Sequence, residues 1–201
     1  MKKYIIEFIG TFFLVLVVGL TGNPLAIGVV LAAMVYMGGY ISGAHYNPAV
    51  TVGLLLSKKI SSDIALRYIL TQFLASIIAA AIYFVIRGNT FVPEIGSHVS
   101  FLSAALVELL FTFLLVSVVL HVAATEKTKG NDYFGIAIGL TLMAAVFAGG
   151  PISGGAFNPA VGIGPILFDV THISTHFISF FVYLIGPFVG GALASVIYKL
   201  K

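Results

Sequence analysis

Long apolar runs separated by short polar segments dominate this chain of 201 residues. A helix that crosses a membrane needs about 20 mostly apolar residues. Six runs approach this length: Tyr4–Leu20, Leu25–Ser42, Ala65–Ile86, Phe101–Ala124, Phe134–Gly150 and His176–Tyr198. The pattern therefore predicts an all-α membrane protein with six spanning helices.

Two shorter apolar runs, Asn47–Leu56 and Asn158–Phe168, each begin with Asn-Pro-Ala. Asn is a preferred helix N-cap, and proline is tolerated at the first helical position because it needs no donor there. At about 10 residues, neither run is long enough to cross a membrane. Because exposed loops are usually polar, both runs predict re-entrant half-helices rather than surface loops.

The two Asn-Pro-Ala runs belong to a duplicated sequence. Ala26–Gly53 and Ala137–Gly164 lie 111 positions apart and are identical at 16 of 28 positions. We expect one transmembrane domain, residues 1–201, with equivalent halves at about 1–95 and 96–201. Three spans in each half would invert the second half relative to the first. Inverted repeats place the functional site at their interface, near the bilayer midplane.

The inverted halves would bring the N-termini of the two half-helices together. Each N-terminus carries unpaired N–H groups and about half a positive charge. The irregular backbone before each half-helix would supply carbonyl groups, and the Asn amides would supply donors. The expected motif residues are Asn47, Pro48, Ala49, Asn158, Pro159 and Ala160, and the expected pore-lining backbone is Gly43, Ala44, His45, Gly154 and Ala156. Such a path would hydrogen-bond a neutral solute and repel cations.

Two acids, Glu7 and Glu108, lie at matching places inside predicted spans. In a structural interpretation, each carboxyl group accepts hydrogen bonds from the unpaired backbone of a broken segment. In a functional interpretation, the acids relay protons in an inverted-repeat secondary transporter. We favour the structural one. The acids near span ends are expected to be solvated: Asp63, Glu126, Asp132 and Asp169.

Composition and charge narrow the class of protein. Hydrophobic residues make up 60% of the chain and charged residues only 8%, whereas a soluble domain carries about 25% charged residues. With the N-terminus inside, nine of the ten basic residues fall on the cytoplasmic side: Lys2, Lys3, Lys58, Lys59, Arg67, Lys127, Lys129, Lys199 and Lys201. This asymmetry predicts a multi-pass protein of the cell membrane with both termini cytoplasmic.

Several functions lack the residues that they need. The chain has no cysteine and no paired histidines with a nearby carboxylate, so we expect no metal and no cofactor. No nucleophile–base arrangement is present, so we expect no enzyme activity. The basic residues form no patch on a polar face, and we therefore expect no nucleic-acid partner.

These motifs closely resemble those of the major intrinsic protein family, the aquaporins and glycerol-type channels. The resemblance rests on Ser42–Thr51 and Ser153–Ala160, with support from Glu7–Thr11, Gln72 and Val182–Ala192. It implies a right-handed bundle of six spanning helices and two half-helices. It also implies a homotetramer in membrane lipid, with one pore in each subunit.

The resemblance also locates a selectivity filter, at Ile27, Val146, Gly155 and Val161. Most family members carry arginine where this chain has Val161, and none of the four residues has a polar side chain. An apolar, wider filter favours small neutral solutes such as glycerol-like polyols, urea or undissociated metalloid acids like arsenous acid, together with water. A water-selective aquaporin, the secondary transporter using Glu7 and Glu108, and a non-conducting adhesive protein remain as alternatives.

Overall fold

A computed structural model describes residues 1–200 of the chain, and Lys201, one of the basic residues used to predict orientation, lies outside them. Six long helices account for most of the described residues: α1 (Lys2–Thr21), α2 (Pro24–Ser42), α4 (Ser62–Arg87), α5 (Phe101–Val122), α6 (Phe134–Ser153) and α8 (Phe177–Tyr198). All six are long and apolar enough to cross a membrane. The six predicted spans are therefore confirmed, with ends that differ by at most three residues.

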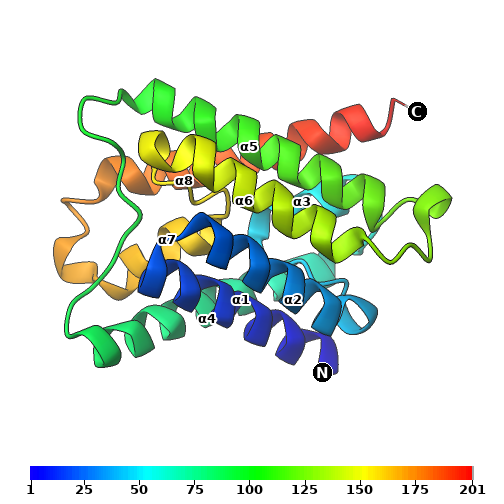
Figure 1. The fold of residues 1–201 in the computed structure, drawn as a ribbon, viewed down its shortest axis with the longest axis horizontal. Helices are drawn as coiled ribbons and strands as arrows, with labels where there is room; N and C mark the ends of the chain where they lie inside the picture. Colours follow the sequence, from blue (N-terminus) through cyan, green and yellow to red (C-terminus); the bar gives the residue numbers. More distant parts are fainter. Residues whose placement is uncertain (201) are drawn as a thin grey trace.

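Two short helices complete the bundle, α3 (Pro48–Leu56) and α7 (Pro159–Phe168), together with the 3₁₀ turns η1 (Glu126–Thr128) and η2 (Val170–His172). Figure 1 shows α3 and α7 at opposite ends of the bundle, each surrounded by long helices. Helix α1 begins and α8 ends at the same end as α3, which we call the terminal end. The half-helices thus enter from opposite sides, as the inverted repeat predicts.

Helix α6 continues beyond its predicted end at Gly150, through Pro151 to Ser153. Proline inside a helix removes one backbone hydrogen bond, but in the last turn this loss is confined to a single carbonyl. Gly154 ends the helix at a φ of 89°, and its N–H donates to the Gly150 carbonyl over 2.9 Å. The observed helix therefore ends three residues after the end predicted from the apolar run.

Close backbone contact between α2 and α6 joins the two halves. A Cβ atom added to Gly28 would lie 2.6 Å from the Gly139 carbonyl oxygen, and one added to Gly139 would collide with the Gly28 carbonyl. The two glycines occupy equivalent positions of the repeat, and their contact is reciprocal. A reciprocal contact between equivalent residues marks a twofold axis, so the repeat axis passes between Gly28 and Gly139.

The outer faces of the long helices carry exposed apolar side chains, such as Leu66, Leu70, Leu102 and Phe147. No more than 44% of the most apolar stretch of any long helix is buried. Most of this apolar surface therefore faces outward, where only lipid or a neighbouring subunit could cover it.

Candidate functional site

Both half-helices begin at the Asn of an Asn-Pro-Ala motif. The Asn47 Oδ1 atom accepts a hydrogen bond from the Ala49 N–H over 2.8 Å, and Asn158 Oδ1 accepts one from the Ala160 N–H over 2.9 Å. Each Asn has an extended backbone, and proline occupies the first helical position after it. The sequence Asn-Pro-Ala thus caps each helix with its own side chain.

The two caps also bond across the repeat axis. Asn47 Nδ2 donates to the Phe157 carbonyl and Asn158 Nδ2 donates to the Tyr46 carbonyl, both over 2.9 Å. This reciprocal pair holds the two helix N-termini face to face in the middle of the bundle. An amide nitrogen carries two N–H groups, so each Asn has a second donor beyond this bond.

The carboxyl group of Glu7 serves the irregular segment before α3. Its Oε1 atom accepts from the His45 N–H over 2.9 Å and from the Ser42 hydroxyl over 2.7 Å. Its Oε2 atom accepts from the Tyr46 N–H over 2.8 Å and from Gln72 Nε2 over 2.9 Å. Glu7 is fully buried, and without it the N–H groups of His45 and Tyr46 would lose their partner in the interior.

Glu108 has the equivalent place beside the segment before α7 and is also fully buried. Its Oε1 atom accepts from the Ala156 N–H over 3.0 Å and from the Ser153 hydroxyl over 2.8 Å. Its Oε2 atom accepts from the Phe157 N–H over 2.6 Å. Bonds of this kind are what the structural interpretation of the two acids requires.

The irregular segments need this support because their backbone is strained. Ala44 and Tyr46 have φ values of 51°, and Phe157 has a φ of 47°. Residues other than glycine adopt this left-handed region at a cost and persist there when neighbouring groups hold them. Glu7 and Glu108 supply that restraint from behind the segments.

A cavity of about 20 Å³ lies at the centre of the bundle, between the two Asn caps. This volume is enough for one water molecule. Its polar side chains are His45, Asn47 and Asn158, and the rest of its wall is apolar or glycine. A larger cavity of about 620 Å³ opens at the terminal end and shares Ala44, Val119 and Ile138 with the central one. The two cavities are therefore neighbours along the bundle, and these three residues lie between the terminal end and the Asn pair.

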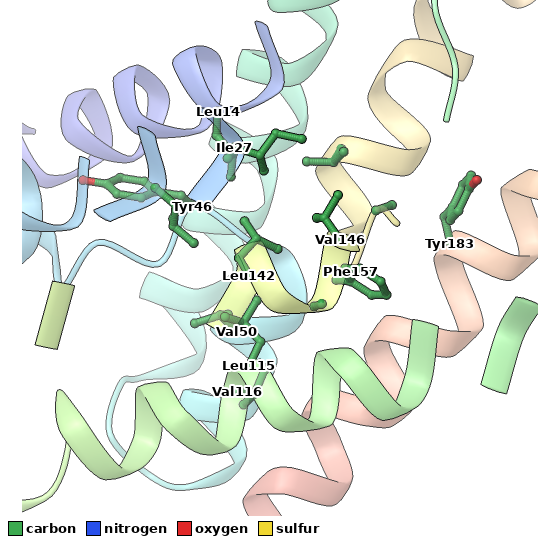
Figure 2. Packing of buried hydrophobic residues seen from close by; sticks show 14 of the residues in the cluster. Leu14, Ile27, Tyr46, Val50, Leu115, Val116, Leu142, Val146, Phe157 and Tyr183 are labelled. Atoms are coloured by element: carbon green, nitrogen blue, oxygen red, sulfur yellow. The ribbon is translucent and has the colours of Figure 1, made fainter. Parts of the chain in front are cut away.

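Three of the four expected filter residues line the central cavity. Ile27, Gly155 and Val161 line the central cavity, whereas Val146 does not, although it is buried with 7% exposure. Val146 lies one turn along α6 from Leu142, which does line the cavity (Figure 2).

The five residues expected to line the pore with their backbone do not all lie at the same cavity. Ala44, His45 and Ala156 line the central cavity, and Gly43 lines the larger one. Gly154 lines neither, because it packs against Tyr183 and the backbone of Glu94. The remaining motif residues are buried and do not line the cavities: Pro48, Ala49, Pro159 and Ala160.

Half of the residues that line the cavity come from the long helices, and of these only Ile27 was expected from the sequence. These residues form four identical pairs, 101 positions apart between α1 and α5 and 111 positions apart between α2 and α6: Leu14 and Leu115, Val18 and Val119, Ile27 and Ile138, Leu31 and Leu142. The repeat contains the signal that would have found them. Glu7 and Glu108 lie 101 positions apart, which gives the spacing of the repeat between α1 and α5. The same spacing relates the lining residues of these two helices.

Asp169 was expected to be solvated, and this is wrong. Its side chain is buried beneath the segment after α7 and accepts hydrogen bonds from Thr90 over 2.6 Å, His172 over 2.8 Å and Thr171 over 3.0 Å. The bond from Thr90, followed by that from His172, lowers the pKa of Asp169 to about 2. Asp169 thereby ties the α4–α5 connection to the α7–α8 connection. Within residues 1–200, no three metal-binding side chains gather into a site.

Comparison with known proteins places this geometry in a family. The profile of the family described as "Major intrinsic protein" matches residues 1–198. The chain is 36% identical to a glycerol uptake facilitator protein-like 6 from Lactiplantibacillus plantarum, over 97% of this chain and 95% of that protein. It is 34% identical to the aquaporin AqpM of Methanothermobacter thermautotrophicus, over 98% and 96% of the two chains.

A solved structure agrees at the level of the fold. The X-ray structure of the aquaglyceroporin from Plasmodium falciparum superimposes with a TM-score of 0.85, covering 98% of this chain and 95% of that one at 22% identity. The fold match and the six apolar helices identify a multi-pass membrane protein. With the family profile covering nearly the whole chain, this protein belongs to the major intrinsic protein family.

Proposed function

We propose that the protein is a passive channel, not an enzyme, for small neutral solutes and water. The solutes we propose are glycerol-like polyols, urea and undissociated metalloid acids such as arsenous acid. The observation that carries this proposal is the central cavity, which Asn47 and Asn158 both line and whose only other polar side chain, within residues 1–200, is His45. A neutral solute exchanges part of its water shell for these polar groups, while the two helix N-termini repel cations.

The two buried acids support passive transport. Coupled transport needs an ionisable group that can exchange protons or ions near the midplane. Glu7 and Glu108 do not line the central cavity, and their oxygens accept hydrogen bonds from the half-helix segments. His45 is the ionisable side chain on the cavity wall, and its Nδ1 lies 3.0 Å from the Thr51 hydroxyl.

The preference for solutes larger than water rests on the filter. We propose that Ile27, Val146, Gly155 and Val161 form it, with valine in place of the family's usual arginine. Three of these line the central cavity, and none offers a polar side chain. A wall without a charged donor has no group that narrows the path or holds a water file in place. The name of the glycerol uptake facilitator relative is consistent with this preference.

We further propose that the protein lies in the cell membrane as a homotetramer with both termini cytoplasmic. The basic residues near the terminal end support the orientation. The apolar outer faces of the long helices would contact lipid and neighbouring subunits. The halves at about 1–95 and 96–201 would form one channel domain, because both contribute to the same cavity.

A vesicle assay tests this function. Purified protein in liposomes should accelerate swelling in gradients of glycerol, urea and arsenous acid, and water flux should be measured in the same vesicles. A Leu66→Ile variant on the exposed face of α4 serves as the matched control and should conduct like wild type. Flux that requires an imposed proton gradient would instead favour a secondary transporter. Water flux without solute flux would favour a water-selective aquaporin, and no flux at all would contradict the proposal.

A further inference from the structure

The wall of the central cavity repeats itself about the axis between Gly28 and Gly139. Ile27 and Ile138 both line the cavity, and so do Val50 and Val161. The members of each pair are the same residue type at equivalent positions of the repeat. The path therefore offers similar surfaces on both sides of the Asn pair.

The repeat gives each residue of the proposed filter an equivalent on the other side of the Asn pair. We call Ile27, Val146, Gly155 and Val161 the outer ring. Their equivalents, each 111 positions away, are Ile138, Val35, Ala44 and Val50, which we call the inner ring. Three of the four equivalents are identical, and the fourth replaces glycine by alanine.

We infer that the inner ring, Val35, Ala44, Val50 and Ile138, is a second specificity-determining constriction of this channel. The inference rests on the proposed function, because it concerns which neutral solutes pass. The inner ring lies between the Asn pair and the large cavity at the terminal end. A solute then meets one apolar ring on each side of the Asn donors.

The lining of the two cavities places the inner ring at the neck between them. Ala44 and Ile138 line both cavities, Val50 lines the central one, and Val35 lines the larger one. All four residues are buried, with exposures from 2% to 7%. These residues thus lie between a cavity of about 620 Å³ and one of about 20 Å³.

The difference between the rings makes the inner one at least as restrictive. Ala44 carries a methyl group where the outer ring has Gly155, and the neighbouring His45 stands where the second half has Ala156. Both His45 and Ala156 line the central cavity. Widening at Gly155 and Val161, which the missing arginine suggests, therefore has no matching widening on the inner side.

Two constrictions in series predict a non-additive result when each is widened. If the two resistances are similar, removing one raises permeability by at most about twofold, whereas removing both raises it much further. We would measure glycerol and a four-carbon polyol in vesicles containing Val50→Ala, Val161→Ala or both. Each single variant should gain up to about twofold, and the double variant should exceed the product of the two gains.

Two controls keep this test sharp. Val116→Ala removes the same methyl groups from a buried valine that does not line the cavity, and it should conduct like wild type. If the double alanine variant does not fold, Val50→Thr and Val161→Thr keep the side-chain shape and add a hydroxyl group to each ring. They should show the same non-additive pattern, because each hydroxyl group lowers the dehydration cost at its own ring.

The outcomes separate the inference from the proposed function. If Val50 substitutions change nothing and Val161→Ala alone matches the double variant, the outer ring is the single constriction and the inference is wrong. That result leaves the channel function intact, because wild-type protein still conducts glycerol. Wild-type protein that conducts no solute would overturn the proposed function, and the second constriction with it.

Discussion

The two half-helix segments have the same sequence at the motifs where they meet, but the residues that support the two motifs differ. Both place Asn-Pro-Ala-Val at the centre of the bundle. Behind the first motif, the hydroxyl of Thr51 lies within hydrogen-bond distance of His45 and Gln72. In the second half the equivalent positions hold Gly162, Ala156 and Tyr183.

The second half replaces these hydrogen bonds with packing. The Tyr183 side chain lies against Gly162, where no Cβ atom would fit, and its hydroxyl donates to the Ser153 carbonyl over 2.7 Å. The same cap geometry is thus supported by a polar network on one side and by an aromatic ring on the other. We therefore expect the function to depend on the identical residues at the centre and to tolerate different supports around them.

The largest effect should come from removing a supporting acid. Glu108→Leu would orphan the Ala156 and Phe157 N–H groups in the interior, each at a cost of about 1–3 kcal/mol. Glu7→Leu would orphan two backbone N–H groups in the same way, those of His45 and Tyr46. We expect both variants to lose the folded protein, as measured by size-exclusion chromatography after detergent extraction. Glu108→Gln should fold and retain most of its flux. A folded Glu108→Gln protein whose flux is abolished in a pH-dependent way would instead support a proton relay.

A charge at the centre should break the equivalence of the two caps. Asn158→Asp preserves shape but places a carboxylate where two helix N-termini and a neutral amide stood, so cations should no longer be repelled. Cation conductance in planar bilayers measures this, with Asn47→Asp as the equivalent variant in the other half. Both should conduct cations or fail to fold. A cation-tight and fully active Asn158→Asp protein would contradict the central position of Asn158.

The different supports can be compared directly by removing one polar group from each. Tyr183→Phe loses a hydroxyl group whose single proton is shared between the Ser153 and Pro93 carbonyls, and should lower the free energy of unfolding by about 1–2 kcal/mol. Gln72→Met removes one of the four donors to the fully buried Glu7 carboxyl group and should cost about 1–3 kcal/mol. Thermal unfolding in one detergent measures both changes. Equal effects would show that the two supports do not differ in strength.

The smallest expected effect concerns Asp169, outside the half-helices. Its pKa of about 2 in the folded protein lies below the ordinary value of about 3.9, so its contribution to stability is complete above the ordinary value. That contribution is lost as the pH falls through about 2. Asp169→Asn should therefore lower the melting temperature at pH 6. It should also make the melting temperature less dependent on pH between about 4 and 2. Asp63→Asn, at an exposed ion pair with Arg67, is the control and should change little.

Parts of the molecule built from local signals could be predicted from the sequence. The six spans follow from apolar length, and Asn47 and Asn158 follow from the chemistry of helix caps. The repeat then required the two half-helices to enter from opposite ends. Each of these features depends on residues that are neighbours in the chain or related by one fixed spacing.

The parts that could not be predicted depend on packing in three dimensions. Asp169 is buried because two distant connections fold over it, and no sequence pattern near it signals this. Val146 falls one turn away from the central cavity because helix rotation decides which side chain faces the path.

The most direct test of the central claim is the substitution Val161→Arg. An arginine at this position would add a charged donor to the outer ring, narrow it and repel small cations. The measurement is the permeability of glycerol and arsenous acid relative to that of water, for wild type and variant in the same vesicle preparation. We predict that the ratio of solute to water permeability falls, with only partial conversion because Ile27 and Gly155 remain. An unchanged ratio would contradict the placement of Val161 in the filter and the solute preference derived from it.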